Sequence, residues 1–174
     1  MISNVRNIKA FMLACLLALA FVVPPADSTH AETLDETLEK RLLFFTHYIA
    51  TSAHTFTPEN APSIAPKILR FTVGSEKTSL RDFLDEHAGY IVREGLSGTF
   101  SPSVESFRAT PLTGEATGFR TRLRGTRAMT LDFQGEEAYT KDILEVELDV
   151  TPTEITEENP FGLYLTRYGE QALE

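Results

Sequence analysis

The sequence of 174 residues contains a single cysteine, Cys15, which lies inside an apolar run near the N-terminus. The rest of the chain therefore has no disulfide, and a domain formed there depends on its hydrophobic core. Hydrophobic residues make up 42% and charged residues 24% of the chain, which is ordinary for a globular protein. The length fits one domain plus a targeting segment.

Basic side chains are also scarce. The chain has 16 lysine and arginine residues against 25 aspartate and glutamate residues, a formal net charge of −9. Residues 1–31 hold Arg6, Lys9 and Asp27, so residues 32–174 carry 14 basic and 24 acidic side chains and a net charge of −10. Because phosphate neutralisation dominates affinity for nucleic acids, we expect no direct nucleic-acid binding by this domain. The charge also disfavours adhesion to an anionic membrane surface.

Motifs of catalysis and cofactor binding are absent as well. The sequence has no G-x-S-x-G nucleophile elbow, no P-loop and no dinucleotide fingerprint. His47 and His54 are seven residues apart and could share a helix face, but two ligands without a third are weak evidence for zinc. His87 lies among apolar residues and is interpreted as a hydrogen-bonded core residue. We therefore predict a protein that is not an enzyme, with no catalytic residues, no metal site and no cofactor.

The longest apolar run occupies residues 10–23. Residues 1–9 before it are polar with two positive charges, and residues 24–32 after it form an expected linker that starts with two prolines. Fourteen helical residues span about 21 Å, less than the roughly 30 Å hydrocarbon core of a bilayer. We expect a short cytoplasmic N-terminus, an apolar span, a linker and an exported domain over residues 33–174.

Two interpretations of this apolar run stay open. A signal peptide would be cleaved after Thr29-His30-Ala31 and would release the domain into the periplasm. An uncleaved signal anchor would extend its span with Ile8, while Lys9 reaches the membrane interface, and would give a single-pass inner-membrane protein. Both interpretations send the rest of the chain across the membrane.

A long amphipathic helix is predicted directly after the linker. Thr33 and Glu36 form a capping-box pattern at its start. Apolar residues then recur at spacings of three and four, which is typical of one buried helix face. These residues are Leu34, Leu38, Leu42, Phe45, Ile49, Ala53 and Phe56. Leu43, Phe44 and Tyr48 widen the face, so we expect a sheet or a partner to cover this helix.

Two further helical segments are expected. Thr57-Pro58-Glu59 has the residues of a helix start, but Pro62 and Pro66 break this element, which should end near Phe71. The next segment is a third helix that ends at Gly95. Its apolar stripe consists of Leu80, Phe83, Leu84, His87, Ala88 and Ile91.

After Gly98 the apolar residues alternate, which predicts antiparallel strands. The predicted strands cover 104–109, 119–124, 129–133, 144–150 and 161–168, with a bulge or bend at Gly125 and a turn over 134–136. The positions expected to face the core are Phe119, Leu123, Leu144, Val146 and Leu148. Three helical segments followed by such strands indicate an α+β domain whose helices cover one face of the sheet.

Two charged stripes occupy the polar faces of consecutive predicted strands. They are Arg120, Arg122 and Arg124 on one strand and Glu145, Glu147 and Asp149 on the next. Opposite charges that face each other across a ladder add about 0.2–1 kcal/mol per pair and help to set the register. We interpret the stripes as such pairs, and an anion or partner site on the arginines is the alternative.

The most informative segment is Asn159-Pro160-Phe161-Gly162-Leu163-Tyr164-Leu165. Pro160 cannot continue a hydrogen-bonded ladder, and Gly162 permits a positive φ or a close backbone approach. The segment is therefore predicted to be a rigid corner that places the last strand.

Taken together, these features resemble a known family. An apolar N-terminal segment, a long helix, a Thr-Pro-Glu start, a third helix and strands lead to the N-P-F-G-L-Y-L element, which follows a Thr-Pro turn in Val150-Thr151-Pro152-Thr153. This order resembles the TraE/TrbF family of conjugal transfer proteins and their relative, the eighth VirB component of type IV secretion systems. The specificity of the match rests mainly on residues 143–168.

The resemblance implies a cone-shaped α+β roll of the nuclear transport factor two type, located in the periplasm below a single membrane anchor. It implies a structural role in assembling a conjugative type IV secretion channel, with self-association and contacts to other channel subunits. The family's Asn-Pro-x-Gly interaction region corresponds to Asn159, Pro160, Phe161 and Gly162. The chain departs from larger members because it has almost no cytoplasmic region. The alternatives are a periplasmic small-ligand-binding or enzymatic domain on the same roll, or a freely secreted domain.

Overall fold

The computed structural model describes residues 34–113, 117–133 and 136–173 of the chain. The expected N-terminal segment, apolar span and linker over residues 1–32, together with Thr33, lie outside the described residues. Within the described ranges, no helix is both long and apolar enough to cross a membrane. The expected division into residues 1–9, 10–23, 24–32 and 33–174 stays a prediction.

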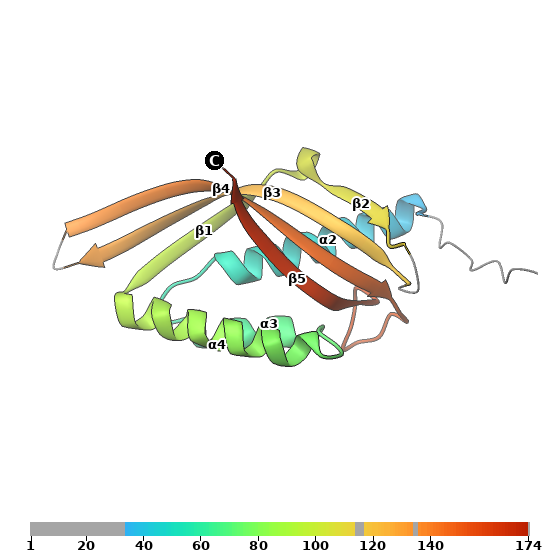
Figure 1. Ribbon diagram of the computed structural model, residues 1–174, viewed down its shortest axis with the longest axis horizontal. Helices are drawn as coiled ribbons and strands as arrows, with labels where there is room; N and C mark the ends of the chain where they lie inside the picture. The colour runs from blue at the N-terminus through green and yellow to red at the C-terminus, as the bar shows by residue number, and fades with distance from the viewer. Residues whose placement is uncertain (1–33, 114–116, 134–135, 174) are drawn as a thin grey trace, which may run out of the picture. The chain divides into compact units, whose positions relative to one another are not determined.

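Among the described residues, three α-helices and two short 3-10 helices (η) precede or interrupt a five-stranded sheet (Figure 1). In chain order the elements are α2 (Glu36–His54), η1 (Ala61–Ser63), α3 (Ile64–Leu69), α4 (Glu76–Glu94), β1 (Leu96–Pro102), η2 (Val104–Ser106), β2 (Arg108–Pro111), β3 (Phe119–Phe133), β4 (Glu136–Pro152) and β5 (Leu163–Leu173). The predicted α+β class is therefore confirmed.

The long first helix is present, but its N-cap differs from the prediction. The Asp35 carboxylate accepts a hydrogen bond from the backbone N–H of Leu38 at 2.7 Å, so Asp35 caps α2. The predicted stripe is buried from Leu38 to Ala53. The helix ends at His54, and Phe56 follows in an isolated bridge to Gly98.

The capping contacts predicted at Thr57 are present, but the helix begins later than predicted. The Asn60 side chain accepts a hydrogen bond from the backbone N–H of Thr57 at 2.9 Å, and the Thr57 hydroxyl accepts one from the backbone N–H of Asn60 at 3.4 Å. Helical structure begins only at Ala61, and α3 ends at Leu69, before the expected end near Phe71. The third helix is confirmed as α4, and Gly95 ends it in the left-handed conformation with φ 68°.

The strands differ from the prediction before residue 119. The segment 104–106 is a 3-10 turn, because the Ser106 hydroxyl donates to the carbonyl of Ser103 at 2.6 Å and a local turn replaces the strand. The sequence pattern also missed β1, which covers residues 96–102. No bulge occurs at Gly125, because β3 pairs continuously with β4 there. A Cβ at Gly125 would lie 2.6 Å from Cε2 of Phe100, so this glycine makes room for an aromatic ring.

The strand order is β1–β3–β4–β5, all antiparallel, and β2 pairs with another part of β3. The helices lie against one face of the curved sheet (Figure 1). The five positions predicted to face the core, Phe119, Leu123, Leu144, Val146 and Leu148, are all buried there. Between them, the hydroxyl of Thr121 meets that of Thr46 from α2 at 2.8 Å, which ties the helix to the sheet. The core is therefore filled where helix α2 crosses β3.

Candidate protein-interaction surface

The corner between β4 and β5 is built around the buried side chain of Asn159. Its amide Nδ2 donates to the carbonyl of Leu163 at 3.1 Å, and its backbone N–H donates to the hydroxyl of Thr156 at 3.0 Å. The carbonyl of Asn159 accepts from the backbone N–H of Gly162 at 3.0 Å, which closes a turn over Pro160 and Phe161. Asn159 is 4% exposed and thus acts inside the corner.

Gly162 ends this turn with φ 57°, in the left-handed region that disfavours other residues. A Cβ there would lie 2.9 Å from the carbonyl oxygen of Thr153 and would also strike Arg41. Arg41 projects from α2 and donates two hydrogen bonds to the corner, from Nε to the carbonyl of Phe161 at 2.9 Å and from Nη2 to that of Gly162 at 2.8 Å. The corner is therefore fastened to the first helix.

Phe161 anchors the same corner through aromatic contacts. Its ring centroid lies 5.4 Å from those of Phe45 and Tyr48 on α2 and 5.6 Å from that of Phe71 after α3. Aromatic pairs at such separations add about 0.5–1.5 kcal/mol beyond the area they bury. Three segments far apart in the sequence thus meet at one ring.

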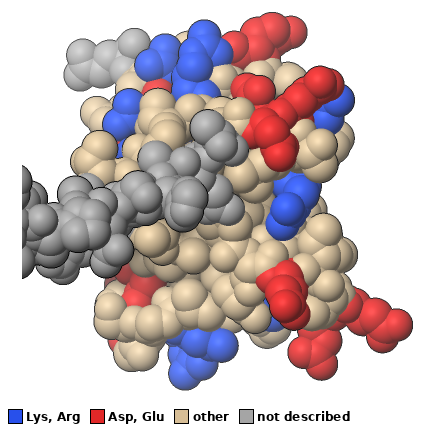
Figure 2. All heavy atoms as spheres, turned by 90° about the vertical axis from the view of Figure 1, so that its right-hand side faces the viewer, with Lys and Arg blue, Asp and Glu red and all other residues tan. Residues whose placement is uncertain are grey.

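A groove of about 680 Å³ runs between α2 and this corner. Its lining consists of Arg41, Phe44, His47, Tyr48, Thr51, Ser52, Pro160 and Phe161, and we call it the α2–corner groove. Phe44 is 63% exposed and adds an accessible apolar ring to this groove. Figure 2 views the end of the molecule where β3 begins and β4 ends, and acidic and basic side chains are mixed there.

The structure divides the four corner residues predicted to form an interface. Pro160 is exposed and Phe161 is half-buried, and both line the α2–corner groove. Asn159 and Gly162 are buried and hold the turn. Sequence reasoning missed Arg41, because one arginine on the polar side of a helical stripe carries no signal of a partner 120 residues away.

The charged stripes form a cross-strand ladder on β3 and β4. Arg120 makes a bidentate pair with Asp149 at 2.7 and 2.9 Å. The other pairs are Arg122 with Glu147 and Arg124 with Glu145, both at 2.7 Å, and Arg167 of β5 also reaches Glu147 at 2.9 Å. The interpretation of the stripes as cross-strand pairs is confirmed by this register.

The pairing shifts the pKa values of Glu147 and Arg120. Burial pushes the pKa of Glu147 upward, but the hydrogen bond from Arg122 and the charges of Arg120 and Arg167 lower it overall. The hydrogen bond to Asp149 and the charge of that carboxylate raise the pKa of Arg120. Both shifts favour the charged forms of Glu147 and Arg120.

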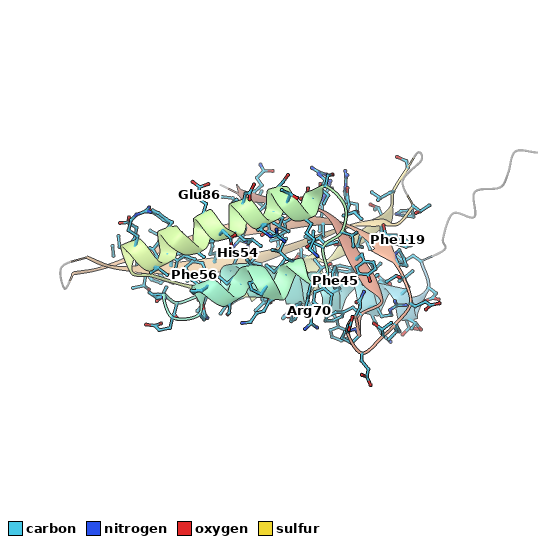
Figure 3. All side chains as sticks on the ribbon, turned by 90° about the horizontal axis from the view of Figure 1, so that it is seen from below. Phe45, His54, Phe56, Arg70, Glu86 and Phe119 are labelled. Carbon is cyan, nitrogen blue, oxygen red and sulfur yellow. The ribbon has the colours of Figure 1, made fainter. Side chains whose placement is uncertain are left out.

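A second polar cluster lies on the inner face of the sheet, where sequence reasoning expected only apolar side chains. His54 is 3% exposed, and its Nε2 lies 3.0 Å from the Tyr168 hydroxyl and 3.2 Å from Oε2 of Glu170. The Tyr168 hydroxyl donates to the same carboxylate at 2.7 Å, which leaves Nε2 of His54 to donate its own hydrogen. Figure 3 shows His54 between α2 and α4.

Burial pushes the pKa of Glu170 upward, but the hydrogen bond and charge of His54 and the hydrogen bond of Tyr168 lower it to about 2. Beside this cluster, Arg127 and Asp142 form an ion pair at 2.6 Å. Nε2 of His54, the Tyr168 hydroxyl and the Glu170 carboxylate contact one another, and the buried Nδ1 of His54 has no hydrogen-bond partner among the described residues. The cluster ties the end of α2 to β5. We call His54, Tyr168 and Glu170 the polar lock.

The histidines are dispersed. His54 belongs to the polar lock, His47 lines the α2–corner groove, and His87 packs edge-on against Phe56 and parallel to Phe83. Burial lowers the pKa of His87, and the nearby His54 lowers it further. Across the described ranges, no three histidine, cysteine or acidic residues are grouped so as to hold a metal ion.

No protein-family model matches the chain, and no curated protein matches its sequence. Several solved structures match its fold. CagV of Helicobacter pylori strain 26695, a VirB8 homologue of a type IV secretion system, aligns with a TM-score of 0.59 and 12% identity over 78% of this chain and 99% of that chain. VirB8 of Agrobacterium tumefaciens aligns with a TM-score of 0.57 and 10% identity over 82% and 97% of the two chains.

A third match is an IcmL-like type IV secretion system protein of Legionella pneumophila, with a TM-score of 0.57 and 11% identity over 81% of this chain and 95% of that chain. The architecture is thus an α+β roll of the nuclear transport factor two type, with helices on one face of a curved sheet. Within that class the chain has the VirB8-like fold, so the resemblance expected from the sequence is confirmed at the level of the fold.

Proposed function

We propose that this protein is a structural component of a conjugative type IV secretion system and acts through protein–protein contacts. The observation that carries the proposal is the α2–corner groove, which combines the Asn-Pro-x-Gly corner with exposed apolar side chains on a VirB8-like fold. Fold alone does not establish function, so the proposal rests on both features together.

The proposed contact surface is the α2–corner groove, with Phe44, Pro160 and Phe161 as its apolar contacts. Their partners are other secretion-channel subunits or a second copy of this chain. Asn159 and Gly162 contribute indirectly, because their buried hydrogen bonds hold Pro160 and Phe161 in place. A rigid, preorganised corner loses little conformational entropy on binding.

We also propose that residues 10–23 anchor the protein in the inner membrane and that residues 33–174 lie in the periplasm. The positive charges at Arg6 and Lys9 support this orientation. The alternative is cleavage after Ala31, which would leave a soluble periplasmic domain. N-terminal sequencing of the protein recovered from membranes distinguishes the two: an intact Met1 supports the anchor, and a start at residue 32 contradicts it.

A small-ligand-binding or enzymatic role has less support. The inward positions of the sheet are filled by apolar side chains. Most of the polar groups that converge on its inner face bond one another, and among the described residues the buried Nδ1 of His54 is left without a hydrogen-bond partner. A role in assembly needs no such site, so we propose that the protein is not an enzyme.

The test is deletion of the gene from its host, followed by measurement of conjugative DNA transfer per recipient. Loss of transfer that the full chain restores would support the proposal, and unchanged transfer would contradict it. A photo-crosslinking amino acid at Pro160 should then yield a defined product with a channel subunit or a second copy. The control is Tyr139, another exposed residue, which lies on the β3–β4 hairpin and is 64% exposed.

A further inference from the structure

Within the described residues, the outer edge of β5 is covered only along its first half. The backbone of Leu165 exchanges two hydrogen bonds with the segment that follows α3: its N–H donates to the carbonyl of Phe71 at 2.8 Å, and its carbonyl accepts from Val73 at 3.1 Å. The N–H of Tyr168 then donates to a carboxylate oxygen of Glu76, at the start of α4, at 2.9 Å. Beyond Tyr168, no described segment bonds to the backbone at the outer edge of β5.

The register shows which groups come next. Tyr168 faces Leu148 of β4, but its N–H points outward to Glu76, so this is a non-hydrogen-bonded pair of the ladder. Such pairs recur at every second residue of an antiparallel ladder. The next two are Glu170 opposite Val146 and Ala172 opposite Leu144, so the backbone N–H and C=O groups of Glu170 and Ala172 also point outward. Among the described residues, no other segment forms backbone hydrogen bonds with this end of β5.

The opposite edge of the sheet is closed differently. Along β1, Gly98 exchanges two backbone hydrogen bonds with Phe56 at 2.8 and 2.9 Å, and the N–H of Phe100 donates to the hydroxyl of Thr55 at 3.2 Å. Proteins commonly cover or blunt their edge strands because unpaired edges recruit other strands. Among the described residues, backbone hydrogen bonds thus cover both edges in part, and the end of β5 is one of the edge stretches that they leave open.

A shallow groove runs beside this open edge. A hollow of about 240 Å³ lies between α4 and β5 and is lined by Ser79, Leu80, Phe83, Tyr168 and Glu170, among others. A second hollow of about 370 Å³ shares Phe83 and continues along α4 past His87 and Tyr90. Phe83 is 43% and Tyr90 46% exposed. In Figure 1 the last part of β5 rises away from α4.

We propose that the outer edge of β5, from Tyr168 to Leu173, binds an extended segment of a partner protein as an additional strand. The open backbone groups of Glu170 and Ala172 would pair with the segment, and its inward side chains would cover Phe83 and Tyr90. Alternate side chains of a strand are about 6.8 Å apart. Helix positions four residues apart, such as Phe83 and His87, are separated by roughly 6 Å along the axis, so successive inward side chains of a strand can contact successive residues of α4. An extended strand thus fits this surface better than a helix, which has no free ladder groups.

The charges around the groove specify the partner further. Glu76 and Glu170 line the first hollow and Glu86 lines the second. Arg93, which also lines the second, already pairs with Glu94 at 2.8 Å. Glu86 points from α4 away from α2 (Figure 3). We therefore infer a segment that alternates apolar and polar residues and carries lysine or arginine. This binding site is independent of the proposed role in secretion.

The test selects random dodecapeptides displayed on phage against the full chain in detergent, and measures the affinity of the enriched peptides by fluorescence anisotropy. Ala172→Pro removes one outward N–H without touching the bonds to β4, because proline is tolerated where an edge N–H faces solvent. It should weaken binding at least about tenfold. Ala172→Val keeps the N–H and is the matched control, with wild-type affinity expected. Both variants should keep the wild-type melting temperature.

A second measurement uses the selected peptides themselves. N-methylation of the residues that face β5 should abolish binding, whereas N-methylation of the alternate residues should not. The amides of Glu170 and Ala172 should exchange rapidly with solvent in the free protein and slowly with peptide bound. The proposal is overturned if no peptide is enriched, if Ala172→Pro binds as wild type, or if these amides are already protected. It is also overturned if Ala172→Pro dissociates a dimer, because β5 would then pair with a second copy.

Discussion

Arg41 and Gly162 lie 121 residues apart in the chain, yet the guanidinium of Arg41 donates a 2.8 Å hydrogen bond to the carbonyl of Gly162. The same side chain also binds the carbonyl of Phe161. Because a guanidinium presents several donors in a rigid plane, it can hold two successive carbonyls at once. The first helix therefore fixes the position of the corner that starts the last strand.

Replacing Arg41 should loosen the corner. We expect Arg41→Ala to lower the free energy of unfolding by about 1–3 kcal/mol, because two half-buried carbonyls lose a charged donor. Arg41→Lys should recover part of the loss, since an ammonium does not reproduce the planar fork. Urea titration followed by circular dichroism measures the change. Lys40→Ala, one residue earlier and exposed, is the control, and equal midpoints for Arg41→Ala and Lys40→Ala would contradict the role given to Arg41.

Two glycine-to-alanine substitutions should have opposite effects. Gly162→Ala places a Cβ at φ 57° and against the carbonyl of Thr153, so we expect destabilisation of about 2 kcal/mol or more. Gly89→Ala lies on the exposed side of α4 with nothing within 4 Å of the added Cβ. It should stabilise the domain by about 0.5–1 kcal/mol. Thermal unfolding of both variants tests the pair, and a neutral Gly162→Ala would show that the corner tolerates other conformations.

Surface variants separate function from folding in the α2–corner groove. Phe44→Gln removes a ring that is 63% exposed, so the unfolding midpoint should change little while DNA transfer falls by about tenfold or more. Tyr139→Gln removes an equally exposed ring on the β3–β4 hairpin and should leave transfer unchanged. Transfer assays with normalised protein levels provide the measurement. Similar transfer by the two variants would remove the groove from the proposed mechanism.

The polar lock predicts an acid-sensitive stability. Glu170 has a pKa of about 2 in the folded chain against an ordinary value of 4.5, so the folded state favours its charged form. Its contribution is complete above about pH 4.5 and is lost as the pH falls toward 2. We expect it to be about 1–2 kcal/mol, less than the full shift corresponds to, because the carboxylate is partly in contact with water.

Unfolding midpoints of wild type and Glu170→Gln, measured from pH 7 to pH 2, check this prediction. The variant should be less stable at neutral pH, and the difference should shrink in acid. Glu157→Gln, in the exposed loop before the corner, should show no such convergence. His87 acts at higher pH: its lowered pKa means that its protonation below about pH 6.5 opposes folding in both proteins. If the difference in unfolding midpoint between wild type and Glu170→Gln does not change with pH, the charged Glu170 does not stabilise the fold through the polar lock.

Much of the fold could be predicted from local patterns. The apolar spacing of three and four predicted the buried faces of α2 and α4, and strict alternation predicted the inward residues of β3 and β4. The paired charges at 120–124 and 145–149 predicted the register of the β3–β4 hairpin. A register shift of one residue would have moved the charged side chains of one strand to the opposite face from their partners. The predicted strand over 104–106 was wrong, because the Ser106 hydroxyl bonds to the carbonyl of Ser103 in a local turn. No bulge occurs at Gly125, where the ring of Phe100 lies against the backbone.

The sequence by itself determined the α+β class, the faces of its main elements and the corner at Asn159–Gly162, because these depend on residues close together in the chain. Only the tertiary structure decided that Pro160 and Phe161 are accessible while Asn159 and Gly162 are buried. It also decided that His54 meets Glu170, and that β5 is covered at Leu165 but open at Ala172. These features arise from contacts between distant segments, whose burial and hydrogen bonds exist only after helices and sheet have packed.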